Sequence, residues 1–438
     1  MEISRRSLLA ATAALAGPAL AKLPWDNKAF PKGFLWGTAT AGHQVEGNNV
    51  NSDIWALEHV TPSIFSESSG DAANSLALWP ADLDLVRRMG LNTYRFSLEW
   101  ARIEPAPGEF SIAMLDHYAA IVEGCRARGL TPMVTFNHFT TPRWFAAMGG
   151  WEGDDAVSFF ERFCDRSARR LADMIGYATT LNEPNLLGQL TVLLPPSEGR
   201  KLADRERAAN EAAARYYAVS RFQAGLVVET EKLARLQANL LVAHRRGRLA
   251  IKAARSDLPV GVSLAIADDQ AAGPNSMRDA VRTKLYDVWL RAARSDDFIG
   301  VQNYERSVWN DKGKLPTPPG VETNDMGSEV YPASLAGAVR YAHAISQVPV
   351  IVTEHGVNAT EDRIRARLIP AALAELQRVM TDGVPVKGYV HWSLVDNYEW
   401  MFGYKFKFGL HTLDRRTFAR TPKPSASVLG GIARRNAL

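Results

Sequence analysis

The sequence predicts an α/β fold, a single (β/α)8 barrel of the TIM type. Short apolar runs alternate with longer amphipathic segments eight times along the chain, which is typical of a parallel barrel. Two of these runs end in a carboxylate and then break at Pro or Gly, as a buried parallel strand does at its carboxyl end. After residue 22, no linker, repeat or low-complexity tract divides the 438-residue chain, so one domain is the simplest account.

The eight predicted strands are short and rich in apolar and β-branched residues. In chain order they are Phe34–Ala39, Thr93–Leu98, Met133–Asn137, Ala178–Leu181, Val260–Ile266, Phe298–Asn303, Val350–Thr353 and Gly388–Ser393.

Three of the predicted helices between these strands are recognised by a glycine that ends them. Gly follows directly after each of three of them, and Gly accepts the left-handed conformation of a helix C-cap. These helices are Pro80–Met89, Met114–Arg128 and Asp155–Ile175. The stretch from Ala203 to Arg255 is helix-rich, and the Pro/Gly-rich stretch from Lys312 to Gly327 is predicted to be a loop near the barrel mouth.

The first 21 residues are predicted to be an export signal. Ser4-Arg5-Arg6-Ser7-Leu8-Leu9 begins an Ala/Leu-rich run that ends in Ala19-Leu20-Ala21, which is typical of a twin-arginine signal cleaved before Lys22. The run is too weakly apolar for a permanent membrane span, and an uncleaved N-terminal anchor is the alternative. We therefore expect a signal over residues 1–21 and one barrel domain over residues 22–438, exported to the periplasm or beyond.

Charge and composition exclude several classes of partner. The net charge is +4, and removing Arg5, Arg6 and Glu2 with the signal leaves +3 (4 − 2 + 1), too small and too dispersed to indicate nucleic acid. Cys125 and Cys164 have no metal-ligand spacing, and each is predicted to fill a packing site rather than form a bridge. The nine histidines form no HExxH motif or Cys/His cluster, so we expect no metal and no cofactor.

Two strings 171 residues apart (354 − 183) carry the candidate chemistry: Thr180-Leu181-Asn182-Glu183-Pro184 and Val352-Thr353-Glu354-His355-Gly356. Each delivers a glutamate at the carboxyl end of a predicted strand, where the active sites of barrels lie. Two carboxylates there suit glycoside hydrolysis, because one must be ionised to attack the sugar and the other protonated to release the leaving group. For either string alone, an ordinary loop glutamate beside a turn is the alternative.

An ordered set of motifs accompanies these strings. It comprises Phe34-Leu35-Trp36-Gly37-Thr38-Ala39-Thr40, Gln44-Val45-Glu46-Gly47, Tyr94-Arg95-Phe96-Ser97 with Trp100, Arg102 and Pro105, the two glutamate strings, and Trp392-Ser393-Leu394-Val395-Asp396-Asn397-Tyr398-Glu399-Trp400. In this order the motifs resemble glycoside hydrolase family 1, the retaining β-glucosidases and their relatives. A lone Asn-Glu-Pro would be weak evidence, but the resemblance extends from about Phe30 to Pro422.

The resemblance implies a role for each catalytic residue. Glu354 is the expected nucleophile, and Glu183 is the expected general acid, which later becomes the base that activates water. Arg95 is expected to keep the nucleophile ionised, Asn182 to bond the sugar 2-hydroxyl and Tyr304 to donate toward Glu354. The alternatives are a structural salt bridge for Arg95 and a plain rim position for Tyr304. The charge of Glu354 should hold the proton on Glu183, with the two carboxyls roughly 5–5.5 Å apart.

Sugar recognition is expected to fall to Gln44, His138, Asn182, Trp392, Glu399 and Trp400. Gln44 and Glu399 can each contact two adjacent hydroxyls, and Trp392 offers an apolar face to the C–H face of a sugar. A lone histidine is more often a satisfied core residue, but the position of His138 at a strand end favours the site.

The C-terminal motif argues against one subgroup of the family. Relatives that cleave 6-phosphorylated sugars carry Ser in place of Glu399, and Lys and Tyr in place of Phe406 and Phe408. Without that cation a phosphate dianion would have no partner, because Lys405 and Lys407 in an extended segment would point the other way. We therefore expect an unphosphorylated sugar.

Several departures from the family pattern concern the pocket. His355 replaces the usual Asn after the nucleophile, and a titratable ring there could shift the pH optimum or reshape the sugar pocket. Phe139 stands where many relatives have Trp, and the segment between Glu183 and Glu354 is short, so the entrance is expected to be more open. Six large side chains could line the entrance, although packing in the core or at the rim is the alternative for most of them: Trp144, Phe145, Met148, Trp151, Trp309 and Met401. An aryl or lipid-like aglycone is conceivable.

The sequence thus predicts a retaining β-glycosidase that hydrolyses terminal non-reducing β-D-glycosides, with glucose as the favoured sugar. A β-galactosidase, a β-fucosidase or a transglycosidase with the same machinery stays open, and a non-catalytic sugar-binding barrel would require a lost acid or nucleophile. The expected partner is a small β-glycoside or oligosaccharide. We expect no nucleic acid and no stable membrane span after signal removal, and the oligomeric state stays open.

Overall fold

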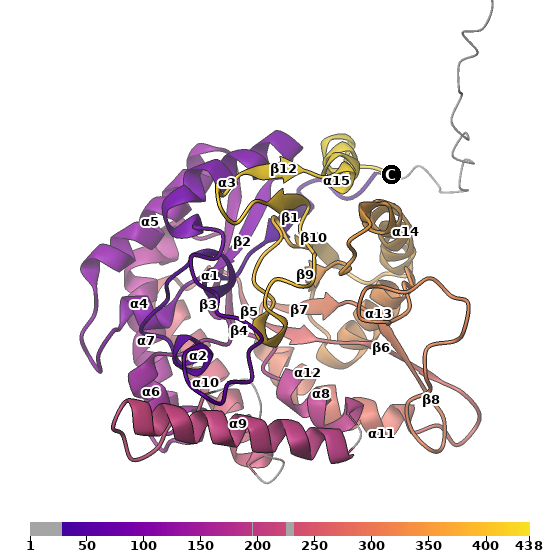
Figure 1. Ribbon diagram of the computed structural model, residues 1–438. Coiled ribbons are helices and arrows are strands. Elements are labelled where there is room, and N and C mark those ends of the chain that lie inside the picture. Colours follow the sequence, from indigo (N-terminus) through magenta and orange to yellow (C-terminus); the bar gives the residue numbers. More distant parts are fainter. Residues whose placement is uncertain (1–28, 195, 225–231) are drawn as a thin grey trace, which may run out of the picture.

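The computed structural model describes residues 29–194, 196–224 and 232–438, and its centre is a closed barrel of eight parallel strands (Figure 1). Around the barrel the strand order is β1-β10-β9-β7-β5-β4-β3-β2. These strands are β1 (Leu35–Ala39), β2 (Thr93–Ser97), β3 (Thr131–Asn137), β4 (Tyr177–Asn182), β5 (Val260–Ala265), β7 (Phe298–Asn303), β9 (Val350–His355) and β10 (Val386–Trp392). Each coincides with a predicted strand, and the (β/α)8 fold is confirmed.

Helices surround the barrel and alternate with its strands (Figure 1). The longer ones are α3 (Ser75–Met89), α5 (Ile112–Ala127), α7 (Ala156–Leu171), α9 (Pro196–Tyr216), α10 (Leu233–Ala254), α13 (Ser334–Ser346), α14 (Asp362–Thr381) and α15 (Pro424–Arg435). Shorter helices lie in the connections: α1 (Gly42–Val45), α2 (Asp53–Glu58), α4 (Trp100–Ile103), α6 (Arg143–Ala147), α8 (Leu186–Leu193), α11 (Arg278–Arg282) and α12 (Val288–Ala292).

The start of helix α3 and one of the predicted glycine caps differ from the prediction. Helix α3 begins five residues before Pro80, although Pro is favoured at the first helical position. Gly90, with φ of 80°, is the left-handed cap that the sequence predicts after α3. Gly176 is not among the residues with positive φ. It serves close packing instead, because a Cβ there would lie 2.4 Å from Cγ2 of Thr131.

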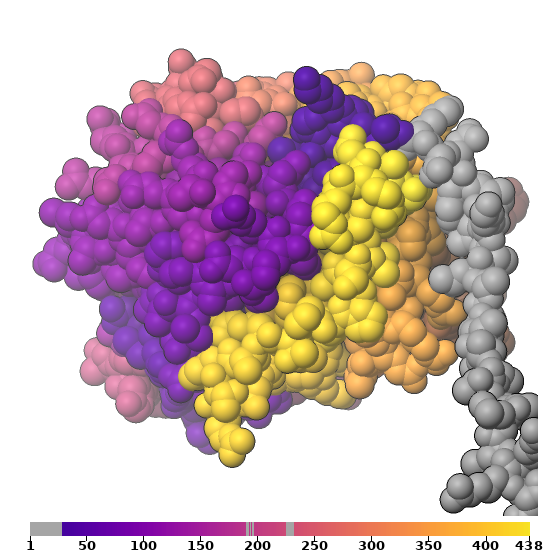
Figure 2. All heavy atoms as spheres, turned by 90° about the horizontal axis from the view of Figure 1, so that it is seen from above, coloured from indigo at the N-terminus to yellow at the C-terminus, as the bar shows by residue number. Residues whose placement is uncertain are grey.

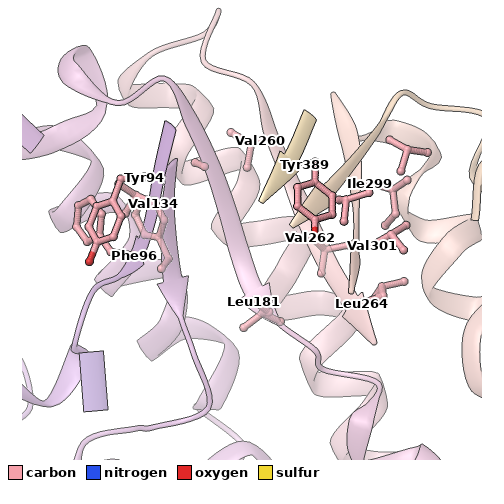
Figure 3. Close-up of a cluster of buried hydrophobic side chains, with 14 of the residues drawn as sticks. Tyr94, Phe96, Val134, Leu181, Val260, Val262, Leu264, Ile299, Val301 and Tyr389 are labelled. Atoms are coloured by element: carbon pink, nitrogen blue, oxygen red, sulfur yellow. The ribbon is translucent and has the colours of Figure 1, made fainter. Parts of the chain in front are cut away.

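The barrel strands are buried along almost their whole length, which positions their ends firmly. Side chains that point outward pack under the helices, among them Val134, Leu181, Val262, Val301 and Tyr389 (Figure 3). A second cluster fills the barrel interior and includes Leu35, Met133, Phe298, Ile351 and Val390. The site residues project from the carboxyl ends of these buried strands.

The end of the chain is fastened to its beginning, and Figure 2 shows the C-terminal segment in yellow against the indigo and purple N-terminal elements. Arg434 donates to the carbonyl of Met89 at 2.7 Å, and the Trp36 indole donates to Oδ1 of Asn436 at 2.9 Å. Two small sheets lie outside the barrel: β11 (His411–Leu413) with β12 (Arg420–Pro422), and β6 (Asp268–Ala271) with β8 (Arg306–Trp309).

Three further expectations have different outcomes. The predicted signal over residues 1–21 lies outside the described residues. Cys125 and Cys164 are both buried and free, as predicted. Across the described residues, no helix has the length and apolar character that a membrane crossing requires.

Candidate active site

A cavity of about 490 Å³ opens at the carboxyl ends of the barrel strands, where the active sites of such barrels lie. The predicted site residues that line it are Gln44, His138, Asn182, Glu183, Tyr304, Glu354, Trp392, Glu399 and Trp400. Arg95 does not line the cavity but bonds the carboxylate of Glu354. The structure therefore brings all the predicted site residues together, although they come from distant parts of the sequence.

Glu354 is held by three donors at the end of strand β9. Arg95 Nη1 lies 2.5 Å and Gln302 Nε2 lies 2.8 Å from Oε1, and the Tyr304 hydroxyl lies 2.6 Å from Oε2. Burial and the charge of Glu354 raise the pKa of Tyr304 well above its usual value, so the hydroxyl keeps its proton and donates. These contacts fix the direction of the carboxylate and favour its ionised form.

Asn182 is oriented by the same network. Its Oδ1 accepts from Arg95 Nη2 at 2.6 Å and from Gln302 Nε2 at 2.7 Å, while its Nδ2 lies 3.2 Å from Nε2 of His138. Gln302 therefore bridges Asn182 and Glu354, a function that the sequence analysis missed. The available signal was a polar side chain near the end of the otherwise apolar strand β7.

Glu183 follows strand β4 in a left-handed backbone conformation, with φ of 44°. Such a conformation is uncommon for a residue with a side chain and recurs at functional sites. The strand register also shifts between Thr179 and Asn182, and an irregularity of this kind re-aims the side chains that follow it. Together these features turn the Glu183 side chain into the cavity.

The two carboxyls have unequal proton affinities. Burial, and then the charge of Glu354, raises the pKa of Glu183 well above its usual value. Burial also raises the pKa of Glu354, but Arg95 and Tyr304 oppose that rise. Glu354 is therefore the carboxyl that ionises first, and Glu183 keeps its proton. The sequence analysis attributed the Glu183 proton to repulsion alone, whereas burial is the larger cause.

Replacing Arg95 with Gln should shift the acidic limb of the pH–activity profile to higher pH. Without the guanidinium, the pKa of Glu354 rises, and an opposite charge at this range is worth about one to three pKa units. The profile of kcat/KM measured from acidic to neutral pH checks this, with circular dichroism to verify folding. Arg95→Lys keeps the charge and should leave the limb closer to its original position. An unmoved limb in a folded Arg95→Gln protein would refute the assignment.

Three nearly parallel rings, those of Trp400, His138 and Trp392, line one side of the cavity, and the ring of His43 continues the column behind Trp400. His43 and Trp400 are separated by 5.7 Å at 6°, Trp400 and His138 by 6.2 Å at 11°, and His138 and Trp392 by 5.7 Å at 15°. Phe139 lines the cavity and packs edge-on against Trp400 at 5.3 Å, so it forms part of this wall.

His43 anchors this column, although the sequence analysis assigned it no function. Its Nε2 lies 2.9 Å from Oε1 of Glu58, and both side chains are fully buried. Burial disfavours the imidazolium, but the charges of Glu58, Glu99 and Asp53 together raise the pKa of His43 above its usual value. These charges favour the protonated ring, and in that form His43 would add a cation–π attraction to its stacking on Trp400.

Three of the predicted sugar-binding residues each have a buried polar atom without a hydrogen-bond partner among the described residues: Gln44 Oε1, His138 Nδ1 and Glu399 Oε1. The rest of Gln44 is fixed, since its Nε2 donates to the carbonyl of Tyr398 at 2.6 Å. Buried polar atoms without partners are costly in a protein on its own. A ligand with several hydroxyls would satisfy these three, as the sequence analysis expected of these residues.

His355 does not line the cavity, so the suggested reshaping of the sugar pocket by this residue is wrong. Its ring faces away from the cavity, and Nδ1 lies 2.9 Å from the hydroxyl of Tyr389, which is also 3.0 Å from Nδ1 of His391. Burial lowers the pKa of His355 to about 3. Adjacent residues of a strand point to opposite faces, so His355 points outward where Glu354 points inward.

Replacing His355 with Asn should therefore leave the pH dependence of kcat/KM unchanged. With a pKa of about 3, the ring is neutral over the whole range in which the enzyme can be assayed. The Tyr389 hydroxyl loses one buried partner, which we expect to cost about 1–3 kcal/mol of stability. Profiles of kcat/KM against pH for both proteins check the first effect, and urea denaturation checks the second. A shift of either limb of the profile in His355→Asn would contradict the outward orientation of the His355 ring.

Of the two places suggested for six large side chains, the structure favours the core and rim over the entrance. Trp144, Phe145 and Trp151 surround the fully buried Trp100, with ring separations of 6.0, 4.8 and 6.3 Å. Trp309 is buried and donates to Asp269 at 2.6 Å. The remaining two candidates, Met148 and Met401, do not line the cavity either. Large apolar side chains that follow a barrel strand cover the core more readily than they remain at a wet entrance.

Among the described residues, four carboxyl side chains line the cavity: Glu183, Glu305, Glu354 and Glu399. No Lys or Arg joins them in that lining. Phe406 is buried and Phe408 lines the cavity, while Lys405 lies over the ring of Phe406 and Lys407 donates to the carbonyl of Tyr404. The described residues also contain no cluster of metal-binding side chains.

Sequence comparison finds one matching family. The model of Glycosyl hydrolase family 1 matches residues 26–290 and 291–438. A beta-glucosidase of Agrobacterium sp. is 28% identical, with 92% of this chain and 95% of the relative covered. Beta-glucosidase 47 of Arabidopsis thaliana is 27% identical (91% and 84% covered), and a beta-galactosidase of Pyrococcus woesei is 26% identical (93% and 97% covered).

Solved structures show the same architecture. The apo structure of a beta-glucosidase 1317 is 40% identical with a TM-score of 0.86, covering 92% of this chain and 98% of that one. The beta-glycosidase BGL167 is 44% identical with a TM-score of 0.85, covering 93% and 98%.

Proposed function

Because the chain belongs to glycosyl hydrolase family 1, we propose that it is a retaining β-glucosidase whose double displacement uses Glu354 as nucleophile and Glu183 as acid and base. The observation that carries these assignments is that the two buried carboxyls differ in pKa, with that of Glu183 raised the more strongly. Arg95, Gln302 and Tyr304 converge on Glu354, whereas burial and repulsion keep the proton on Glu183.

In the first step, the Glu354 carboxylate attacks the anomeric carbon as the glycosidic bond breaks. Glu183 donates its proton to the departing oxygen, so the aglycone leaves as a neutral alcohol. Asn182, fixed by Arg95 and Gln302, can bond the 2-hydroxyl, where contacts strengthen in the transition state. The product is a glycosyl ester of Glu354.

In the second step, esterification has removed the charge that raised the pKa of Glu183. Glu183 can then act as a base, take a proton from water and direct the water to the anomeric carbon. The ester breaks, Glu354 regains its charge and the sugar leaves with its original configuration. The separation of roughly 5–5.5 Å between the carboxyls stays a prediction, and the configuration of the first product, read by proton NMR, tests it.

Glucose is the favoured sugar because the relatives from Agrobacterium sp. and Arabidopsis thaliana are both named beta-glucosidases. The Pyrococcus woesei relative is named a beta-galactosidase, so galactose or fucose is the second candidate. If acceptors compete well with water for the glycosyl ester, the enzyme also transfers sugars.

A panel of p-nitrophenyl β-glycosides tests the proposal, with phenolate release as the readout. Faster release from the glucoside than from the galactoside or fucoside supports a β-glucosidase. Release mainly from another epimer keeps the mechanism and changes the sugar. No release from any glycoside, combined with measurable glucose binding, would indicate a sugar-binding barrel instead.

We also propose export through the N-terminal twin-arginine sequence to the periplasm or beyond. The support is the pair Arg5-Arg6 followed by an Ala/Leu-rich run and Ala19-Leu20-Ala21. Replacing Arg5 and Arg6 together with Lys should trap the precursor inside the cell, whereas an unchanged distribution between cell fractions would refute this route.

A further inference from the structure

The column of rings beside the cavity rests on a hydrogen-bonded pair, His43 and Glu58. Neither residue lines the cavity, and both side chains are fully buried. We propose that His43 and Glu58 are positioning residues for sugar binding, which hold the Trp400 ring and its loop in the orientation that accepts a sugar. This proposal rests on the proposed function, since it concerns how the sugar of that reaction is held.

Trp400 needs support from its surroundings. Its backbone is left-handed, with φ of 51°, a conformation that is rare for a bulky residue and persists only where neighbouring groups fix it. Its ring is half-buried and lies in the column between His138 and His43, with centroid separations of 6.2 and 5.7 Å. Without the His43 ring, Trp400 would lose its support on the side away from the other two cavity-lining rings.

Glu58 fixes the plane of the His43 ring. Oε1 of Glu58 lies 2.9 Å from Nε2 of His43, and the backbone N–H of His43 donates to Oε1 of Glu99 at 2.8 Å, so the residue is held at both ends. Burial alone would raise the pKa of Glu58, but His43 and the hydrogen bonds from Ser69 lower it below its usual value. Glu58 is therefore a carboxylate with two accepting oxygens.

The second oxygen of Glu58 supports the loop of Trp400. Oε2 accepts from the backbone N–H and the hydroxyl of Ser69, at 2.9 and 2.7 Å. The carbonyl of Ser69 accepts in turn from the hydroxyl of Tyr404, and Oε1 of Glu67 accepts from the backbone N–H of Tyr404 at 3.0 Å. Tyr404 follows Trp400 in the same connection between β10 and β11. One carboxylate thus holds both the ring behind Trp400 and the loop that carries it.

The pair acts on sugar recognition rather than on the nucleophile. Gln44 directly follows His43, and its Nε2 lies 3.5 Å from Oε2 of Glu399, so a displaced column also disturbs two of the predicted sugar contacts. The donors to Glu354 come from strands β2 and β7 and from the residue after β7, and they do not depend on the column. The affinity for the sugar should therefore change more than the chemical step.

The test replaces each member of the pair with Gln. His43→Gln keeps a donor for Glu58 and removes the ring behind Trp400. Glu58→Gln keeps the shape of the side chain but offers one accepting oxygen to the donors of both His43 and Ser69. In both variants, KM for p-nitrophenyl β-glucoside should rise roughly tenfold, as it does when the binding orientation is populated about a tenth of the time. The value of kcat should stay within about threefold.

The matched control is His59→Gln. His59 is exposed and its ring stacks on Trp55 at 4.2 Å, in a histidine–tryptophan pair that does not line the cavity. The KM of the His59→Gln enzyme should equal that of the parent enzyme. A merely structural role of His43 and Glu58 would lower the folded fraction, and with it the apparent kcat, and would leave KM unchanged. In a Trp400→Ala background, His43→Gln should have no further effect on KM, because its target is gone.

Two results would overturn the proposal: an unchanged KM in either folded Gln variant of the pair, or increases in KM that multiply when His43→Gln and Trp400→Ala are combined. Calorimetric binding of glucose, or of galactose or fucose where the wild type prefers it, separates this proposal from the proposed function. A Kd that rises in His43→Gln and Glu58→Gln but not in His59→Gln supports the pair even if no glycoside is cleaved. Absence of cleavage would refute only the enzymatic assignment.

Discussion

The Glu354→Gln protein should fold normally and lose at least about 10⁴-fold in kcat on p-nitrophenyl β-glucoside. The amide is similar in shape but cannot attack the anomeric carbon, and loss of a nucleophile that acts with its partners costs up to about 10⁶-fold in other hydrolases. Circular dichroism and phenolate release are the two measurements. Because the amide also leaves the buried Arg95 without its counter-charge, we expect a lower unfolding midpoint as well.

The matched control is Glu361→Gln, seven residues further along the chain. Glu361 is exposed and pairs with Arg363, so the activity of the Glu361→Gln enzyme should stay close to that of the parent enzyme. A second check uses Glu354→Gly with added azide. An external anion entering the vacated space attacks from the nucleophile's side and should yield the α-glucosyl azide. Wild-type turnover by a verified Glu354→Gln preparation would remove Glu354 from the nucleophile role.

The barrel could be predicted because buried parallel strands leave a local signal. The run from Val350 to Thr353 is β-branched throughout and apolar as far as Val352, which is typical of a strand that is buried on both faces. Helix starts were less predictable: α5 begins at Ile112 because Ser111 caps it by accepting from Met114 N at 3.2 Å. A single serine before an ordinary stretch is a weak signal in a sequence.

The members of the site could be predicted from their motifs, but side-chain direction could not. His355 is adjacent to Glu354 in sequence, yet the alternation of the strand turns it into the layer under the helices. Gln302 and His43 act through contacts with residues 52 and 357 positions away, respectively. Met326 lines the cavity only because hydrogen bonds within its own loop and to Thr360 hold that loop in place.

The Glu183→Gln protein should lose about 10²–10⁴-fold in kcat/KM on glucosides whose leaving group needs a proton, which is the usual contribution of a general acid. A 2,4-dinitrophenyl leaving group needs no proton, so its glucoside should still form the glycosyl ester. Without a base the ester then hydrolyses slowly, and stopped-flow absorbance should record a burst of dinitrophenolate followed by a slow steady state. Azide needs no base and should restore turnover, with the β-glucosyl azide as product. Equal losses on both leaving groups would place Glu183 outside the acid role.

The pH dependence provides an independent check with a definite sign. The folded-state pKa of Glu183 lies above its unfolded value, so folding takes up a proton between the two. The stability that this group contributes is complete below the unfolded pKa and is lost as pH rises through the folded pKa. Activity should fall at the upper end of this range, because the folded enzyme loses the proton of the acid as pH passes the folded-state pKa. The side chain in Glu183→Gln cannot ionise. The alkaline limb of the kcat/KM profile should therefore disappear. The part of the fall in unfolding free energy with rising pH that comes from Glu183 should disappear with it. If the limb persisted while the stability slope vanished, the acid would be another group in the cavity, and Glu399, whose pKa is also raised by burial and by Glu354, would be the first to replace.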